Sequence, residues 1–216
     1  MRNAIVALAW MVLAGALAFA AEPRDDGWIR LFDGETFNGW KAVENPDTWK
    51  IEDGKLVCHG PRSHLFYMGD EQPFKNFEFK ADVMTTPGSN SGIYFHTQYQ
   101  ETGWPRYGFE IQVNVSHKDV KKSGGLYSVL DVANPPCKDN EWYTQTIIVR
   151  GKRVISKIND IVVADYREPE GKQPESDKFD RVIGSGTFAL QGHDPASLVY
   201  FKNILVKRLP DDIAEE

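Results

Sequence analysis

The sequence predicts an all-β protein built as two stacked antiparallel sheets, a β-sandwich or jelly roll. Beyond residue 20 its apolar residues show almost no helical periodicity. They lie instead in short runs that are rich in β-branched and aromatic residues and are separated by turn-forming residues. About a dozen such runs in one domain imply two sheets that pack face to face.

Residues 1–20 are expected to be a secretory signal peptide. Arg2 gives a basic start, residues 4–19 form an apolar run, and Ala18 and Ala20 supply the small side chains that precede a cleavage site. The run is too short and too rich in alanine for a membrane anchor. Cleavage after Ala20 would leave a single domain, residues 21–216, that is secreted or periplasmic and is not inserted in a membrane.

The predicted strands follow one another along this domain with turn signals between them. Asp53 and Gly54 form a two-residue hairpin turn, and residues 151–152 and 159–160 connect three later strands. Residues 167–178 are polar and contain proline, which predicts an irregular loop. The expected strands are residues 49–52, 55–58, 77–83, 91–98, 109–115, 125–132, 144–150, 153–158, 161–166, 186–191 and 198–208.

Charge and composition exclude several classes of partner. The formal net charge of −6 becomes −7 when Arg2 leaves with the signal peptide, since 24 basic residues then face 31 acidic ones. A mildly acidic surface argues against nucleic acid, anionic membranes and strongly anionic polysaccharides, whereas neutral ligands stay open. The sequence has no phosphate loop, dinucleotide fingerprint or serine nucleophile elbow. It therefore gives no reason to expect a required cofactor.

Two cysteines, Cys58 and Cys137, would lie in an oxidising compartment. One disulfide between them is open on the sequence. Neither residue belongs to a CxxC motif or stands beside an activating histidine and asparagine. A catalytic thiol is therefore not expected.

Parity along the strands separates an ordinary face from an unusual one. In residues 77–83 the second face carries Glu78, Lys80 and Asp82, which are easily hydrated and typical of a solvated surface. Four other runs have no lysine on their second face, which carries Tyr94, His96 and Gln98, then Glu110, Gln112 and Asn114, then Tyr127, and then Ala189, Gln191 and His193. Aromatic rings beside amides and a carboxylate suit a carbohydrate groove. The alternative is a solvated sheet, and spacing alone does not make these strands neighbours.

Six segments carry a resemblance to a known family. They are GWIRLFDGETFNGW (27–40), WKIEDGKL (49–56), SNSGIYFH (89–96), YGFEIQV (107–113), GGLY (124–127) and FALQGH with VYFKNI (188–204). In this order they resemble the 3-keto-disaccharide hydrolase domain family. The resemblance implies a concanavalin A-like sandwich with an active groove on one sheet, and action on glycosides already oxidised to a ketone at carbon 3.

The chain departs from the family pattern at two places. His96 stands where the family commonly has arginine, so a smaller, titratable ring replaces a guanidinium. The ending reads Gln191-Gly192-His193-Asp194, where the family often reads QDHG, so an acid has moved. Both changes bear on substrate preference and on activity.

A single carboxylate suggests how such a site would work. Bacterial laminarinases and lichenases resemble an E-x-D-x-E pattern, but here that spacing reads Glu110, Gln112, Asn114. An amide can neither attack the anomeric carbon nor give up a proton, so the two-carboxylate route is disfavoured. A 3-ketone acidifies the hydrogen on carbon 2, which allows β-elimination of the group at carbon 1 followed by addition of water.

The residues expected to do this work fall into two groups. Glu110 and His193 are the expected catalytic pair for proton transfer. The expected substrate-binding residues are Tyr94, His96, Trp104, Arg106, Gln112, Tyr127 and Gln191. An oxidised oligosaccharide or glycoside is the expected partner, and a separate sugar 3-dehydrogenase would have to make the ketone.

Other interpretations stay open beside this one. His96, Glu110 and His193 have the right chemistry for a divalent metal ion, although no spacing rule joins them. Glu110 could be a solvated carboxylate, His193 a plain loop residue and Trp104 a cover for the core. The remaining histidines, His59, His64 and His117, are expected to be structural or exposed. The rival function is a non-catalytic, lectin-like carbohydrate-binding module, which has no use for a glutamate–histidine pair.

Overall fold

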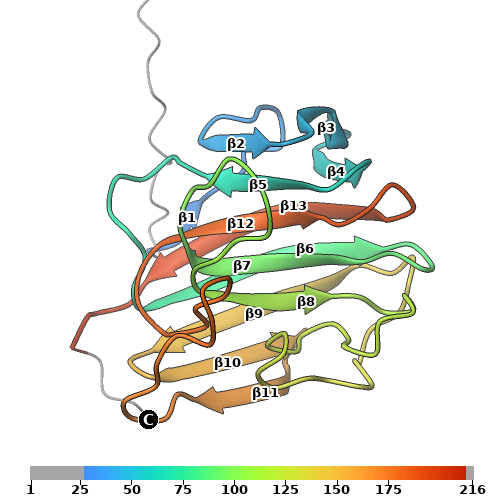
Figure 1. Ribbon diagram of the computed structural model, residues 1–216. Helices are drawn as coiled ribbons and strands as arrows, with labels where there is room; N and C mark the ends of the chain where they lie inside the picture. Colours follow the sequence, from blue (N-terminus) through green and yellow to red (C-terminus); the bar gives the residue numbers. More distant parts are fainter. Residues whose placement is uncertain (1–26, 213–216) are drawn as a thin grey trace, which may run out of the picture.

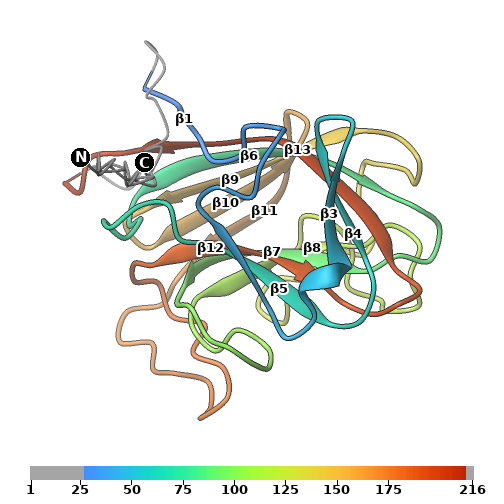
Figure 2. The same ribbon diagram turned by 90° about the horizontal axis from the view of Figure 1, so that it is seen from above.

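Two antiparallel sheets make up the computed structural model, which describes residues 27–212 (Figures 1 and 2). The expected signal peptide, residues 1–20, lies outside the described residues. Among the described residues there are thirteen strands and a single turn of 3₁₀ helix, Pro46–Thr48. The prediction of an all-β, two-sheet antiparallel sandwich is confirmed.

The larger sheet has eight strands. Its order is β11 (Ile161–Arg167), β10 (Arg153–Ile158), β9 (Tyr143–Arg150), β6 (Phe77–Thr85), β13 (Leu198–Arg208), β4 (Lys55–His59) and β3 (Trp49–Glu52), and β1 (Ile29–Arg30) also pairs with β13. The smaller sheet has the order β2 (Trp40–Val43), β5 (Ser63–Tyr67), β12 (Thr187–Gly192), β7 (Ser91–Thr97) and β8 (Phe109–Val113). The sequence-distant strand β12 thus lies between β5 and β7 (Figure 1).

Most of the predicted strands are present, with ends that differ by up to two residues. The hairpin turn is also as expected, because Asp53 and Gly54 both have positive φ, 47° and 76°. Strands β1, β2 and β5 were not predicted. β5 lacks a period of two because all five of its residues are buried, so its sequence shows no alternation.

The prediction of a strand at residues 125–132 is wrong. These residues form turns, with isolated bridges from Leu126 to Ile111 and to Leu130 in place of a strand. Ser128 adopts a positive φ of 59°, which ends any extended run. The turn instead brings Tyr127 beside β8, where its backbone N–H donates to the Glu110 carbonyl over 2.9 Å.

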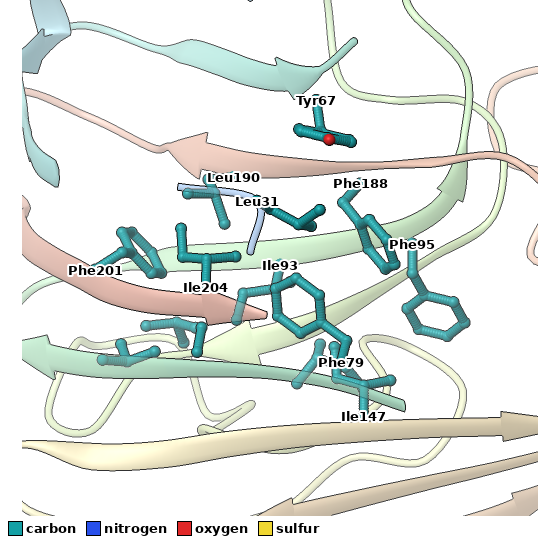
Figure 3. Packing of buried hydrophobic residues seen from close by; sticks show 14 of the residues in the cluster. Leu31, Tyr67, Phe79, Ile93, Phe95, Ile147, Phe188, Leu190, Phe201 and Ile204 are labelled. Atoms are coloured by element: carbon teal, nitrogen blue, oxygen red, sulfur yellow. The ribbon is translucent and has the colours of Figure 1, made fainter. Parts of the chain in front are cut away.

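The main core lies between the sheets (Figure 3). Phe188 of β12 packs against Phe79 of β6, with ring centroids 4.8 Å apart, and against Phe77 at 5.0 Å. On β6 the buried residues alternate with partly exposed ones throughout the strand, as predicted. Every second residue of each sheet is therefore committed to this interior.

The other face of the five-stranded sheet is not simply solvated. Phe66, Ala189 and Tyr94 are cross-strand neighbours there and form a small separate apolar cluster with Val43, against which Tyr99 packs. Tyr99 belongs to the loop of residues 98–108, which therefore covers part of this face. We call this face of the five-stranded sheet the pocket face, because the side chains of Tyr94, Glu110, Gln112 and Gln191 lie on it.

Both cysteines are free thiols in this structure, so the disulfide left open on the sequence is not formed. Cys58 is buried, and its thiol lies 3.6 Å from the Gln191 carbonyl. Burial raises the pKa of the Cys137 thiol to about 11. Within residues 27–212, no helix is both long enough and apolar enough to cross a membrane.

Candidate active site

An open pocket lies over the pocket face, between strands β7, β8 and β12 and three loops. Its space, with the open mouth included, is about 610 Å³, which is in the range of ligand clefts. Its walls combine aromatic rings, amides, two arginines, one glutamate and one histidine. They are formed by Asn90, Tyr94, Trp104, Pro105, Arg106, Gly108, Glu110, Gln112, Tyr127, Phe179, Arg181, Gln191 and His193.

Glu110 is held in place by two neighbouring strands. The Tyr94 hydroxyl on β7 donates to Glu110 Oε2 over 2.9 Å, and Gln191 Nε2 on β12 donates to Glu110 Oε1 over 2.9 Å. Gln191 Nε2 also donates to the Tyr94 hydroxyl oxygen over 3.1 Å. Both carboxylate oxygens are therefore fixed, which sets the direction from which a substrate hydrogen could approach.

The surroundings of Glu110 favour its protonated form. Burial raises the pKa of Glu110 to about 7, although the hydrogen bonds from Tyr94 and Gln191 and the charge of Arg181 work against the rise. Asp119 adds a smaller contribution in the raising direction. A carboxyl group with a pKa near neutrality can both accept and return a proton, which is what a general base needs.

Gly92 provides the space in which the Glu110 carboxylate lies. Gly92 is on β7, opposite Gln112 of β8. A Cβ atom at this position would collide with Glu110 Oε1 and would stand 2.8 Å from Glu110 Cγ and Cδ. The glycine is therefore required here by close approach, although its φ is not positive.

The amide groups of the pocket floor carry unused acceptors. Gln112 Nε2 donates to Asn90 Oδ1 over 2.9 Å, but Gln112 Oε1 is buried without a hydrogen-bond partner. Gln191 Oε1 is likewise buried and unpartnered. Both side chains are at least 97% buried, so these oxygens would gain from hydroxyl donors of a bound ligand.

His193 stands at the end of β12 and is oriented by its neighbour. Its Nδ1 lies 2.6 Å from Asp194 Oδ2, and the same carboxylate oxygen accepts from the Ser197 hydroxyl over 3.0 Å. Burial raises the pKa of Asp194, but the hydrogen bonds from His193, Ala196 and Ser197 outweigh it and hold that pKa below the usual value. With Nδ1 engaged, Nε2 is the nitrogen left for chemistry.

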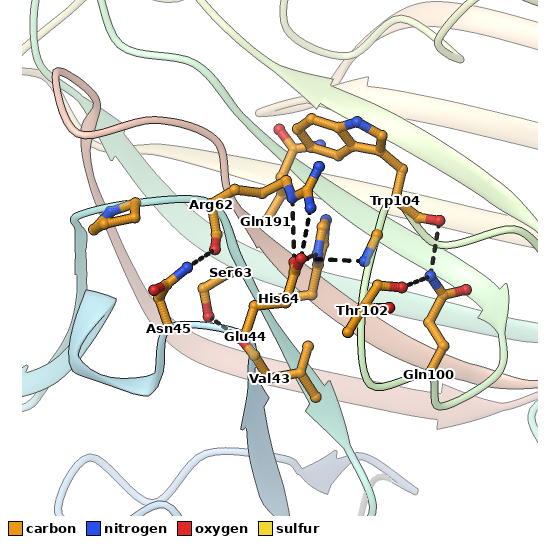
Figure 4. A network of polar contacts seen from close by, with 12 residues as sticks. Val43, Glu44, Asn45, Arg62, Ser63, His64, Gln100, Thr102, Trp104 and Gln191 are labelled. Carbon is orange, nitrogen blue, oxygen red and sulfur yellow. Dashed lines mark hydrogen bonds and ion pairs between the residues drawn. The ribbon is translucent and has the colours of Figure 1, made fainter.

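Trp104 forms one wall of the pocket and is held from behind by a polar network (Figure 4). Its ring centroid is 5.5 Å from that of His193. On its other side lie the His64 ring, at 5.5 Å, and the guanidinium of Arg62, at 5.1 Å. Arg62 makes a two-pronged contact with Glu44, of 2.6 and 3.2 Å, and Glu44 also accepts from the Gly103 N–H.

The structure brings eight of the nine predicted site residues to one pocket. These are Tyr94, Trp104, Arg106, Glu110, Gln112, Tyr127, Gln191 and His193. Arg106 and Trp104, both expected to bind substrate, come from the loop of residues 98–108. Strands β12, β7 and β8 prove to be adjacent, which spacing alone could not establish.

His96 is not among them, and its parity prediction is wrong. Its Nε2 lies 2.8 Å from the Lys75 carbonyl oxygen, and its ring packs on Phe77 and Phe95. The reason is local, because His96 has a φ of 55° beside an irregularity in the β7–β12 register. The turn of the backbone moves the side chain off the pocket face. Burial lowers the pKa of His96 to about 4.

The metal site left open on the sequence, with His96, Glu110 and His193 as its ligands, is not assembled in the described residues. In the part of the chain that the structure describes, no group of three or more His, Cys, Asp or Glu side chains could hold a metal ion. Glu110 and His193 line the pocket, whereas His96 contacts Lys75 and Phe77 instead.

Sequence reasoning missed five residues of the pocket wall, among them Asn90, Phe179 and Arg181. Asn90 ends the turn before β7, and Phe179 and Arg181 belong to the irregular loop after β11. Arg181 has a positive φ of 46°, pairs with Glu175 and places its guanidinium 4.7 Å from the Phe179 ring. Loops have no period, so only their composition could have pointed to these residues.

Comparisons with known proteins identify the family and the fold of the chain. The family model for the 3-keto-alpha-glucoside-1,2-lyase-like domain matches residues 27–207. A 3-keto-disaccharide hydrolase from Bacteroides thetaiotaomicron is 29% identical over 171 residues, which cover 65% of this chain and 59% of that protein. The matched region thus spans less than two thirds of that relative's length.

Solved structures share the fold. A candidate glycosyl hydrolase from Parabacteroides distasonis superposes with a TM-score of 0.71 at 22% identity, over 86% of this chain and 95% of that one. The carbohydrate-binding module CBM66 from Bacillus subtilis superposes with a TM-score of 0.57 at 16% identity, over 78% of this chain and 95% of that one. At these identities the likeness establishes the sandwich and nothing about substrates.

Proposed function

This chain belongs to the 3-keto-alpha-glucoside-1,2-lyase-like domain family, and we propose that it cleaves glycosides already oxidised to a ketone at carbon 3. Membership makes it a glycoside hydrolase-like protein, and the oxidised substrate is the finer part of the proposal. The curated relative, named a 3-keto-disaccharide hydrolase, supports that part. The elimination mechanism is supported by the pocket of this chain.

The observation that carries the proposal is the setting of Glu110. Among the described residues that line the pocket, it is the sole carboxylate. Hydrolysis of an unmodified glycoside by paired carboxylates needs a second one at about 5–10 Å. Elimination from a 3-keto sugar needs one base and one acid, and Glu110 and His193 are the available pair.

In the first step Glu110 takes the proton from carbon 2. The C–H electron pair forms the enolate across carbons 2 and 3, with the negative charge on the former ketone oxygen. Arg181 is suited to stabilise that charge, because a guanidinium has five N–H donors and only part of them is needed for Glu175. His96, an expected substrate-binding residue, does not line the pocket and takes no part in this step.

In the second step the enolate collapses and the leaving group departs. The carbon 3 ketone re-forms, a double bond forms between carbons 1 and 2, and the bond from carbon 1 to the leaving oxygen breaks. The protonated Nε2 of His193 gives its proton to that oxygen, with Asp194 on Nδ1 stabilising the imidazolium beforehand.

Addition of water reverses the proton movements. Neutral His193 takes a proton from water as the hydroxyl adds to carbon 1, and protonated Glu110 returns its proton to carbon 2. Both side chains are then in their starting states, and the net change is hydrolysis. The unpartnered oxygens of Gln112 and Gln191 would accept sugar hydroxyls throughout.

The rival proposal is a carbohydrate-binding module without catalysis. It is favoured by one observation, the fold shared with a carbohydrate-binding module. It gives no role to the raised pKa of Glu110, about 7, because a binding site can use a carboxylate as a hydrogen-bond acceptor but has no need of proton transfer near neutral pH. The tests below separate the two.

Two further parts of the proposal rest on the sequence. A separate sugar 3-dehydrogenase would have to supply the ketone, because no dinucleotide-binding motif is present. Residues 1–20 support action outside the cytoplasm. No required cofactor is proposed, and a divalent ion is tested with chelator.

The deciding experiment uses the purified protein with 3-keto-trehalose and with unoxidised trehalose. We expect release of glucose from the oxidised sugar alone, with hydrogen–deuterium exchange at carbon 2 in D₂O, because proton abstraction precedes cleavage. The rate should fall as pH drops through about 7, since the base must be deprotonated. Loss of activity with chelator would add a metal ion. Binding of both sugars without turnover would favour the lectin-like module.

A further inference from the structure

The polar floor of the pocket extends beyond the pocket itself. Gln191 on β12 is the cross-strand partner of His64 on β5. His64 is fully buried, and neither of its ring nitrogens has a hydrogen-bond partner. The buried polar atoms without partners therefore include the two ring nitrogens of His64 on β5 as well as the oxygens of Gln112 and Gln191.

Trp104 is what ends the pocket on this side. Its ring meets the His64 ring edge-on, with centroids 5.5 Å apart, and Tyr94 meets His64 edge-on from the other side at 5.6 Å. Figure 4 shows His64 between Glu44 and Gln191, with Trp104 above. Trp104 belongs to the loop of residues 98–108, whereas Tyr94 belongs to β7, so Trp104 is the part of this cover that is not in a strand.

The groups around His64 have the chemistry of a sugar site. The Arg62 guanidinium and the Glu44 carboxylate form a bidentate ion pair. Glu44 Oε2 is 3.9 Å from His64 Nδ1. Burial lowers the pKa of His64 to about 4, so its ring is neutral at neutral pH and offers one donor and one acceptor. Planar polar groups beside an aromatic ring suit ring hydroxyls.

The unpartnered nitrogens of His64 indicate that a partner is missing. A buried polar group without a hydrogen bond costs about 1–3 kcal/mol, and such groups in folded proteins usually have a role or a bound water or ligand. Tyr94 and Trp104 contact this ring only through their edges and give it no hydrogen bond.

We propose that His64, Glu44 and Arg62 form a second sugar subsite, covered by Trp104 in this structure, that binds the leaving unit of a disaccharide. The inference rests on the proposed function for its choice of ligand. It places the oxidised unit over Glu110 and the leaving unit toward β5. His193 lies against Trp104 at the junction, where the oxygen that joins the two units must be protonated.

A kinetic experiment compares two oxidised substrates, 3-keto-trehalose and methyl 3-keto-α-glucoside. The readout is the ratio of their kcat/KM values, because a merely structural change lowers both alike. For His64→Phe we expect kcat/KM for 3-keto-trehalose, divided by kcat/KM for methyl 3-keto-α-glucoside, to fall about tenfold. This is the loss expected for one hydrogen bond to the disaccharide. The matched control, His59→Phe, removes an exposed histidine and should keep the ratio within about twofold. An unchanged ratio in His64→Phe would overturn the subsite.

If His64→Phe fails to fold, as judged by near-UV circular dichroism, Arg62→Met takes its place. Its side chain is 40% exposed, so its replacement is better tolerated. The same ratio should fall at least about threefold, since the lost contact is one polar partner. No change there would again count against the proposal.

A binding experiment separates this inference from the proposed reaction. The ring ¹⁵N resonances of His64 are followed in the full chain while unoxidised trehalose or methyl α-glucoside is added. A shift with trehalose that the monosaccharide does not reproduce is expected, and its absence would overturn the subsite. A shift combined with no turnover of 3-keto sugars would keep the subsite and remove the proposed reaction.

Discussion

Polar side chains alternate with apolar ones both on β6 and on the strands of the pocket face. The two faces differ in whether their polar groups have partners within the protein. On β6, Lys80 pairs with Glu78 at 2.9 Å, and Asp82 accepts from Thr144 and from Asn203, each over 2.7 Å. On the pocket face, the amide oxygens of Gln112 and Gln191 are buried without partners. Partnering, more than polarity, distinguishes a surface that serves solubility from one that awaits a ligand.

The largest expected effect is the loss of Glu110 as a base. Glu110→Gln should lower kcat on 3-keto-trehalose about 1,000-fold, because an amide keeps the shape of the side chain but cannot take a proton. Glu78→Gln makes the same chemical change on the outward face and should leave kcat within about twofold. Initial rates of glucose release measure both. If Glu110→Gln kept a tenth of the activity, the two faces would not differ in the way proposed.

Replacing His193 should have the next largest effect. His193→Asn is expected to lower kcat on 3-keto-trehalose about 100-fold, since an amide cannot protonate the leaving oxygen. The loss should shrink to about tenfold on 4-nitrophenyl 3-keto-glucoside, whose leaving group departs without a proton. His59→Asn, on the other sheet, is the control. Equal losses on the two substrates would count against His193 as the acid.

Replacing Gly92 sharpens the comparison, because it removes no polar group and changes only the space available to Glu110. Gly92→Ala inserts a methyl group where the Glu110 carboxylate lies, so we expect kcat to fall about 10–50-fold, as for a misplaced catalytic group. Gly184→Ala is the matched control, because a Cβ there meets no atom within 4 Å and the backbone is not in the left-handed region. Thermal unfolding of both variants would show whether stability changes. Full activity in Gly92→Ala would remove the requirement for this glycine.

The smallest effect is on stability, and its size depends on pH. The folded pKa of Glu110, about 7, exceeds its ordinary value of 4.5. The buried charge therefore destabilises the fold progressively as pH rises from about 4.5 to 7, and the cost is complete above pH 7. Glu110→Gln should raise the free energy of unfolding at pH 8 by on the order of 1–3 kcal/mol.

Urea titrations of the same variant at pH 8 and pH 4 provide the check. The gain should be absent at pH 4, where the glutamate is neutral in both states. Glu78→Gln on the outward face should show no gain at either pH, because its carboxylate is paired with Lys80 near the surface. A gain of equal size at both pH values would mean that burial of the charge is not the cause.

Alternation along the strands allowed most of the fold to be predicted. It failed at β5, where burial of all five residues removes the period, and at residues 125–132, where a positive φ at Ser128 makes turns of a strand-like run. In both cases long-range packing or backbone conformation overrides a local pattern.

The site residues, too, could be predicted where the strand is regular and not where the backbone departs from regular β-structure. Tyr94, Glu110, Gln112 and Gln191 follow from parity, because each is in a regular part of its strand. His96 does not, since its left-handed backbone and the register irregularity turn the side chain off the pocket face. Asn90 and Arg181 come from segments without a period. Their positions depend on the rest of the fold.

The place of β12 in the smaller sheet has a consequence for chain growth. Gln191 and His193 reach the pocket only after Thr187–Gly192 has inserted between β5 and β7, two strands that precede it by much of the chain. A nascent chain therefore carries Glu110 long before Gln191 can complete its surroundings. Such non-local closure is slow compared with the formation of local hairpins, so catalysis would return late in refolding and would report on the completed sheet.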